Sequence, residues 1–101
     1  MEYNTMFIII VNYKIDLSVV ERHLPAHVEF LKANYSLGNI CASGRQVPRT
    51  GGIIMSELKN RAEVERVLSA DPFNINGVAD YQIIEFAPSM ASERWKEVMG
   101  V

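Results

Sequence analysis

The feature that most constrains the fold of this chain is an unbroken apolar run, Met6 to Val11, inside the segment MFIIIVNY at 6–13. The β-branched and aromatic residues of this segment favour an extended strand. Successive residues of a strand point to opposite faces of a sheet, so a run without polar alternation indicates that both faces are buried. The chain must therefore supply packing partners for two sides of this strand.

A helix is predicted next, over 17–35, because apolar residues recur there at helical spacing: Leu17, Val20, Leu24, Val28, Leu31 and Tyr35. Asp16 is a suitable N-cap for this helix, and Gly38 is a suitable terminator. Pro25 interrupts the pattern. It either kinks one helix or opens a second one, where its missing N–H costs little.

The remaining predicted elements are strands over 39–47, 51–58 and 78–86, a helix over 61–70, a loop over 72–77 and a short terminal helix over 92–99. Asn60 followed by Glu63 is typical of a capping box at the start of the second helix. The order β-α-β-β-α-β predicts an α+β, ferredoxin-like fold. This fold has a four-stranded antiparallel sheet with both helices on one face and the first and third strands in the centre.

The other face of this sheet needs a separate explanation. Two helices cover only one face, and water is a poor neighbour for the apolar residues of the other. A second copy packed sheet to sheet would cover it, which predicts a homodimer of the dimeric α/β-barrel type and leaves higher oligomers open. With 101 residues the chain suits a single domain, 1–101, with a short helical tail at 91–99. A domain this small gains from a partner chain.

Composition argues against several classes of partner. A formal charge of −2 without a basic cluster disfavours nucleic acid and anionic membrane surfaces. The longest apolar run, Met6 to Val11, is too short to span a bilayer and lacks the flanks of a signal peptide. The single Cys41 fits a small apolar strand position, and it is compatible with a reducing, cytoplasmic location.

Two polar side chains are predicted to point inward from the two helices. His27 lies on the apolar face of the first helix, between Leu24 and Leu31. The apolar spacing of the second helix continues to position 71, so Asp71 would also face inward, near the end of that helix. Helices side by side on one face of a sheet can bring such groups together. We therefore expect Asp71 to accept a hydrogen bond from the His27 ring.

The pair has a functional and a structural interpretation. An imidazole titrates near neutrality, at about 6.5 when unperturbed, so it can exchange protons with a small molecule, and a carboxylate partner fixes its tautomer. A histidine on an apolar face is more often a satisfied core residue, and an aspartate before proline, as in Asp71-Pro72, is often a turn former. A carboxylate at the C-terminal end of a helix opposes the helix dipole, which is the reason to look for a specific partner of Asp71.

Other candidate sites have less support. His23 lies one turn earlier in a charged run, and the two histidines lack a third ligand, so no metal site is expected. Ser43 is outside any nucleophile motif. The glycines and arginines of 44–52 match no phosphate-binding loop. Arg45 and Arg49 are expected to be solvated loop charges, although they could meet an acidic substrate.

Three segments resemble the YciI-like (YCII-related) family of small α+β proteins: FIIIVNY, RHLPAHVEFLKANYSLGNICASG and LSADPFNINGVADYQIIEF. The family pattern has a histidine in the first helix, a strand ending in Ser-Gly, and Asp-Pro-Phe before the closing strand. Its histidine matches His27 and its aspartate matches Asp71. The resemblance implies a fold similar to muconolactone isomerase and other dimeric α/β-barrel proteins, a dimer, and a pocket with a His–Asp dyad. Many members have proline where this chain has Arg45, and the residues beyond Pro88 lie outside the resemblance.

We therefore expect an enzyme-like protein that needs no cofactor and performs acid–base chemistry on a small organic molecule, such as proton abstraction, isomerisation or elimination. His27 would be the general acid/base and Asp71 its orienting partner, while Ser43 and Arg45 would line the substrate pocket. Two alternatives stay open. One is a small-molecule binding or sensing module in which the pair is a buried, hydrogen-bonded strut, and the other is a structural dimer without a ligand.

Overall fold

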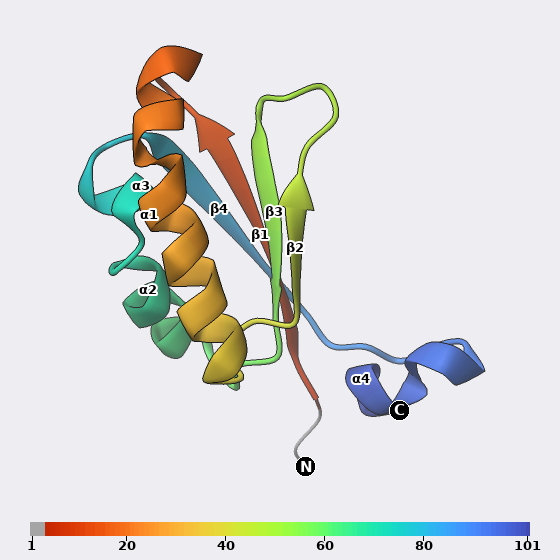
Figure 1. Ribbon diagram of the computed structural model, residues 1–101. Coiled ribbons are helices and arrows are strands. Elements are labelled where there is room, and N and C mark those ends of the chain that lie inside the picture. Colours follow the sequence, from red (N-terminus) through yellow and green to blue (C-terminus); the bar gives the residue numbers. More distant parts are fainter. Residues whose placement is uncertain (1–3) are drawn as a thin grey trace.

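The computed structural model of the protein describes residues 4–101, and residues 1–3 of the expected domain lie outside that description. The elements are β1 (Met6–Tyr13), α1 (Leu17–Ser36), β2 (Ala42–Arg45), β3 (Gly51–Ser56), α2 (Arg61–Leu68), α3 (Pro72–Ile75), β4 (Ala79–Phe86), the 3-10 turn η1 (Glu93–Trp95) and α4 (Lys96–Met99). The strands form one antiparallel sheet in the order β2-β3-β1-β4. Helices α1, α2 and α3 all lie on one face of it (Figure 1). The predicted ferredoxin-like α+β arrangement, with the first and third strands in the centre, is confirmed.

The first helix is continuous, and Pro25 lies inside it. Asp16 occupies the N-cap position, but its side chain makes no capping hydrogen bond. Pro25 is exposed, while Val20 before it and His27 after it are buried against the rest of the protein. Packing on both sides of the proline therefore holds the two halves of α1 together despite the backbone hydrogen bond that the proline cannot donate.

The buried face of α1 is narrower than the sequence pattern predicts. Its buried residues are Val20, His27 and Asn34, seven residues apart. Three members of the predicted stripe are exposed at its edges: Leu17, Val28 and Tyr35. Asn34 is accommodated because its amide donates to the carbonyl of Phe30 at 2.9 Å and accepts from Asn39 at 2.8 Å. The expected apolar stripe thus contains two buried polar residues that both have partners.

The segment that follows α2 differs from the prediction. Helix α2 begins as expected at Asn60, whose side chain accepts a hydrogen bond from the amide of Glu63 at 2.9 Å, but it ends at Leu68 instead of extending to 70. The expected loop over 72–77 contains the short helix α3, with Asp71 as its N-cap and Pro72 in its first turn. Asp71 therefore stands at the favourable N-terminal end of a new helix, and not at the C-terminal end of the preceding one.

The strand β2 is shorter than the predicted strand over 39–47. Its first expected residues form the connection from α1, where the amide of Asn39 bonds to the carbonyl of Asn34 at 2.9 Å. Cys41 is partly buried just before the strand, and its amide bonds to the carbonyl of Met55 at 2.9 Å. Only Ala42–Arg45 pair continuously with β3, because the neighbouring residues take part in the turns at both ends.

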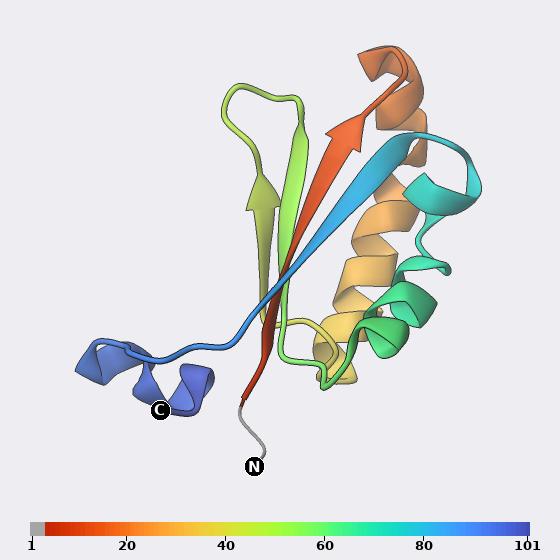
Figure 2. The same cartoon turned by 180° about the vertical axis from the view of Figure 1, so that it is seen from behind.

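The two faces of the sheet have different surroundings. Phe7, Ile9 and Val11 of β1 are buried beneath the helices. On the opposite face, Ile8 stands beside Met55 and Ile84, and the helices leave this side of the sheet uncovered (Figure 2). Six apolar side chains of this face are at least partly exposed, namely Ile8, Ile10, Ile53, Met55, Ile84 and Phe86, whereas Met6 opposite Phe86 is buried. Helices thus cover the continuous apolar run of β1 on only one face of the sheet.

The C-terminal segment leaves the sheet after β4 and lies near the start of β1 (Figure 1). The expected terminal helix is present in two pieces, η1 and α4. The Asn4 side chain donates a hydrogen bond to the carbonyl of Gly100 at 2.7 Å, which holds the end of this segment near the start of β1. Within the described residues, no helix combines the length and apolar character that a bilayer crossing requires.

Candidate functional site

The two predicted inward groups meet above the sheet. Nδ1 of His27 lies 2.7 Å from Oδ1 of Asp71. The Asp71 side chain has no exposed surface, and that of His27 retains 11%. α1 supplies the ring and the start of α3 supplies the carboxylate, so the pair joins two segments that are 44 residues apart in the chain.

The carboxylate of Asp71 accepts two further hydrogen bonds. Its Oδ1 accepts from the amide of Phe73 at 3.0 Å, and its Oδ2 accepts from the Tyr81 hydroxyl at 2.5 Å. An ionised carboxylate is an acceptor only, so three converging donors stabilise its charged form. Burial raises the pKa of Tyr81 far above its usual range, and the hydrogen bond to Asp71 and the charge of Asp71 act in the same direction. Tyr81 therefore remains a donor to Asp71.

Tyr81 is the part of this cluster that sequence reasoning missed. It lies on β4 opposite Val11, whose side chain is buried beneath the helices. The alternation of Ala79, Tyr81 and Ile83 along the strand is the signal that places Tyr81 on the helix-covered face. Its contact with Asp71 depends on how the strand pairs with β1, and a single segment of sequence does not encode that pairing.

Phe73 fixes the orientation of the imidazole. The rings of His27 and Phe73 are stacked, with centroids 3.9 Å apart and planes within 3° of each other. The Asp-Pro-Phe segment thus has three roles: Asp71 caps the helix and holds the ring, Pro72 starts the helix, and Phe73 supports the ring. Because the acceptor Asp71 faces Nδ1, we assign the proton to Nδ1 of the neutral ring, which leaves Nε2 free to accept one.

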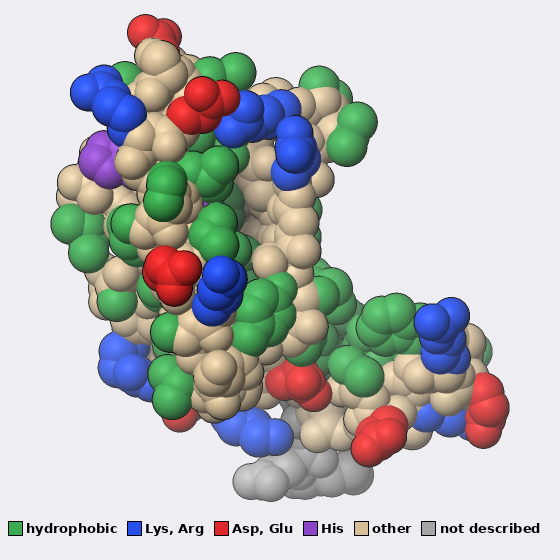
Figure 3. Space-filling view, in the orientation of Figure 1, with side chains coloured by type: hydrophobic (Ala, Val, Ile, Leu, Met, Phe, Trp, Pro, Cys, Tyr) green, Lys and Arg blue, Asp and Glu red, His purple; other side chains and the backbone are tan. Residues whose placement is uncertain are grey.

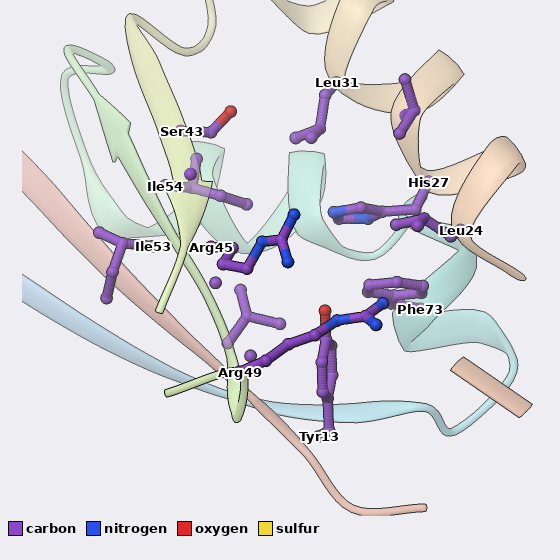
Figure 4. A pocket seen from close by; sticks show the side chains of 15 residues that line it. Tyr13, Leu24, His27, Leu31, Ser43, Arg45, Arg49, Ile53, Ile54 and Phe73 are labelled. Carbon is purple, nitrogen blue, oxygen red and sulfur yellow. The ribbon is translucent and has the colours of Figure 1, made fainter. Parts of the chain in front are cut away.

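The free edge of the imidazole borders a pocket of about 300 Å³. Figure 3 shows it as a hollow between α1 and the β2–β3 hairpin, and Figure 4 shows the side chains that enter it. The pocket-lining residues are Val11, Tyr13, Leu24, His27, Val28, Leu31, Ser43, Gly44, Arg45, Arg49, Gly51, Gly52, Ile53, Ile54 and Phe73. Ser43 and Arg45 are among them, as expected for substrate-pocket candidates, whereas His23 is not.

Two lining residues have partners at the pocket rim. The Ser43 hydroxyl lies 2.5 Å from the Tyr35 hydroxyl, which links β2 to the last turns of α1. Arg49, expected to be a solvated charge, has a side chain only 29% exposed and donates to Glu21 at 3.0 Å. This hydrogen bond raises the pKa of Arg49. Arg49 is thus a partly exposed loop charge, as predicted in part, but it also has an ion-pair partner because the loop before β3 folds back toward α1.

The side chains that could bind a metal ion are dispersed over the described residues. Across residues 4–101, no group of three or more His, Cys, Asp or Glu side chains lies close enough together to hold a metal ion. The titratable cluster instead consists of one imidazole, one carboxylate and one phenol joined by hydrogen bonds. Such a cluster can orient a base and exchange a proton.

Comparison with known proteins gives a family and a fold. The family model described as YCII-related domain matches residues 6–87. No curated protein matches the sequence. Among solved structures, the chain is similar to 5-chloro-2-hydroxyhydroquinone dehydrochlorinase (TftG) from Burkholderia phenoliruptrix AC1100, in complex with 2,5-dihydroxybenzoquinone. The TM-score is 0.68 at 20% identity, covering 85% of this chain and 95% of that one, so the likeness establishes a shared fold.

Proposed function

The chain belongs to the YCII-related family, and from this premise we propose that it performs acid–base chemistry on a small organic molecule without a cofactor. The observation that carries the proposal is the 2.7 Å contact between His27 and Asp71 at the edge of a pocket. A base held in one tautomer, with its free nitrogen at a cavity, is what proton transfer requires.

In the proposed reaction, Nε2 of His27 removes a proton from a carbon next to a carbonyl group of the substrate. The electron pair of the broken C–H bond moves onto the carbonyl oxygen and forms an enolate. The buried carboxylate of Asp71 stabilises the imidazolium through its hydrogen bond to Nδ1. The proton then returns to a different carbon in an isomerisation, or a leaving group departs from the adjacent carbon in an elimination.

A planar ring is the substrate shape that we propose. The solved structure of similar fold carries 2,5-dihydroxybenzoquinone and is named a dehydrochlorinase of 5-chloro-2-hydroxyhydroquinone. In this chain the pocket volume of about 300 Å³ lies at the lower end of the range for small-molecule sites. The apolar walls and the flat His27–Phe73 stack are compatible with a ring of that size.

The proposed assembly is a homodimer formed through the uncovered face of the sheet. Ile84 and Phe86 on that face are 40% and 39% exposed, and Ile8 lies between Ile84 and Met55 across the sheet. A second copy packed sheet to sheet would remove this apolar surface from water. Sedimentation at micromolar concentration should give the mass of a dimer, and a purely monomeric species would contradict this assembly.

A binding or sensing module is the second candidate function. The three hydrogen bonds at Asp71 favour it, because a buried carboxylate with a purely structural role needs the same partners. In that case His27 would hold the pocket together without exchanging protons with a ligand. Removal of the ring would then lower stability strongly, and NMR would show one protonation state across the accessible pH range.

Carbon-bound hydrogen exchange tests the acid–base proposal. A panel of cyclic diketones and hydroxyquinones, including 2,5-dihydroxybenzoquinone, is incubated with the protein in D₂O, and loss of the C–H signal is followed by proton NMR. The expected result is accelerated exchange for at least one ring. The His27→Gln variant should lower this rate by about 10²- to 10⁴-fold, the usual contribution of a general base.

His23→Gln is the matched control, because this histidine lies on the same helix but does not line the pocket. It should exchange the same substrate at the wild-type rate. If the two variants lose equal activity, or if His27→Gln loses none, His27 is not the base.

A further inference from the structure

The pocket carries a positive charge that no neighbouring carboxylate balances. Arg45 and Arg49 both line it, and the described lining residues include no Asp or Glu. Arg49 is neutralised at the rim by Glu21, 3.0 Å away. For Arg45, the residues from 4 to 101 provide no ion-pair partner. The guanidinium of Arg45 is thus the charge that a ligand would meet.

The strand register directs Arg45 toward the pocket. Arg45 follows Ser43 by two positions on β2, so both side chains stand on the face covered by α1. The residue opposite Arg45 on β3 is Gly52, which has no side chain to occupy the space beside it. Figure 4 shows the guanidinium reaching into the pocket on the side of the His27 ring.

The remaining surface of the pocket favours a small ligand with one anionic group. Most of it is apolar, from Leu24 and Leu31 on α1 to Ile54 on β3. A ligand that fills the pocket would displace water from around the exposed guanidinium, which strengthens the attraction between the two charges. The planar fork of an arginine matches a carboxylate through two parallel hydrogen bonds.

We propose that the site takes a small cyclic carboxylate, with the carboxylate bound by Arg45 and the ring in the apolar part of the pocket. This inference rests on the proposed function of His27 and deepens it by naming the substrate class. An anchored carboxylate fixes which ring carbon faces Nε2 of His27. The same guanidinium offsets the negative charge that develops on the substrate when the proton leaves the carbon.

Binding of benzoate and of its neutral isostere benzamide tests the proposal without requiring turnover. Each ligand is titrated into ¹⁵N-labelled protein, and the dissociation constant is taken from amide chemical shifts. We expect wild-type protein to bind benzoate at least tenfold more tightly than benzamide. Arg45→Gln should weaken benzoate binding by about 10- to 100-fold and leave benzamide unchanged, because only the charged hydrogen bonds are lost.

Two further variants isolate the charge. Arg45→Lys keeps a cation but not the fork, so it should retain an intermediate preference for benzoate. Arg66→Gln removes an exposed arginine of α2 that does not line the pocket, and it should bind both ligands like wild type. Equal affinity of wild-type protein for benzoate and benzamide would overturn the proposal, as would a benzoate preference that survives Arg45→Gln. Tighter binding of phenyl phosphate than of benzoate would overturn the choice of carboxylate.

The test separates this inference from the proposed function. Benzoate binding that depends on Arg45, together with carbon exchange that does not depend on His27, leaves the anion site standing and removes the acid–base role. Exchange that depends on His27, together with benzoate binding that Arg45→Gln does not change, removes the anion site and leaves the acid–base role standing. Arg45 is exposed on the edge strand β2, so its replacement should leave the circular dichroism spectrum and the unfolding midpoint unchanged.

Discussion

The hydrogen bond from Tyr81 to Asp71 gives a prediction whose size can be worked from the structure. Tyr81→Phe removes one hydroxyl that donates at 2.5 Å to a fully buried carboxylate. A hydrogen bond to a charged group contributes about 1.5 to 3 kcal/mol. Tyr81 is only partly buried, so we expect a loss near the lower end, about 1.5 to 2 kcal/mol in the free energy of unfolding.

A double-mutant cycle with Asp71→Asn shows how much of this loss depends on charge. Asparagine has nearly the shape of aspartate but is neutral, and a neutral hydrogen bond contributes about 0.5 to 1.5 kcal/mol. Tyr81→Phe should therefore cost about 1 kcal/mol less in the Asp71→Asn background than in wild type. Urea unfolding followed by circular dichroism measures all four proteins, at one protein concentration because an oligomer's stability depends on it.

Tyr35→Phe provides the control for this cycle. Its hydroxyl also makes a short hydrogen bond, but to Ser43, and it lies two turns along α1 from His27. Combined with Asp71→Asn, it should be additive within about 0.5 kcal/mol. Equal costs of Tyr81→Phe in the two backgrounds, or no cost in wild type, would refute the assignment of Asp71 as a buried ionised acceptor of the phenol.

Three other predictions concern stability. The pKa of Tyr81 is raised from 10.0, so the folded protein keeps a proton that the unfolded chain releases. The free energy of unfolding should therefore fall above about pH 10, by at most about 1.4 kcal/mol per pH unit. Tyr81→Phe should remove this part of the decline when stability is measured by urea titration. Asn60→Ala removes the N-cap of α2 and should cost about 1 kcal/mol in thermal unfolding. Gly51→Ala would place a Cβ 1.7 Å from the carbonyl oxygen of Val11 and should cost more than about 3 kcal/mol, whereas Gly44→Ala, with open space around it, should cost less than about 1 kcal/mol.

The parts of the fold that could be predicted from the sequence are those with a local, repeated signal. The apolar runs of β1 and β3 predict strands in the centre of the sheet, and both strands lie there, although the helices cover only one face of each. The Asn60–Glu63 pattern marks the start of α2 because capping involves residues only three positions apart. The position of His27 on the inward face of α1 follows from helical periodicity in the same way.

The parts that could not be predicted depend on short elements or on pairing between distant segments. Helix α3 has four residues, too few to produce a periodic pattern, so Asp71 is misread as the end of α2. The bond from Tyr81 to Asp71 requires the register between β4 and β1, and periodicity carries no information on register. The ion pair of Arg49 with Glu21 at the pocket rim requires the path of the loop that joins β2 and β3.

The double use of Asp71 limits how the sequence can drift during evolution. The same carboxylate caps α3 through the Phe73 amide and holds the His27 ring, so a replacement keeps both contacts only if its side chain also accepts hydrogen bonds from both groups. Asparagine or serine at this position could still cap α3 but would remove the charge next to the imidazole. Folding alone would therefore restrict position 71 to capping residues, whereas it would not by itself keep a negative charge beside the His27 ring.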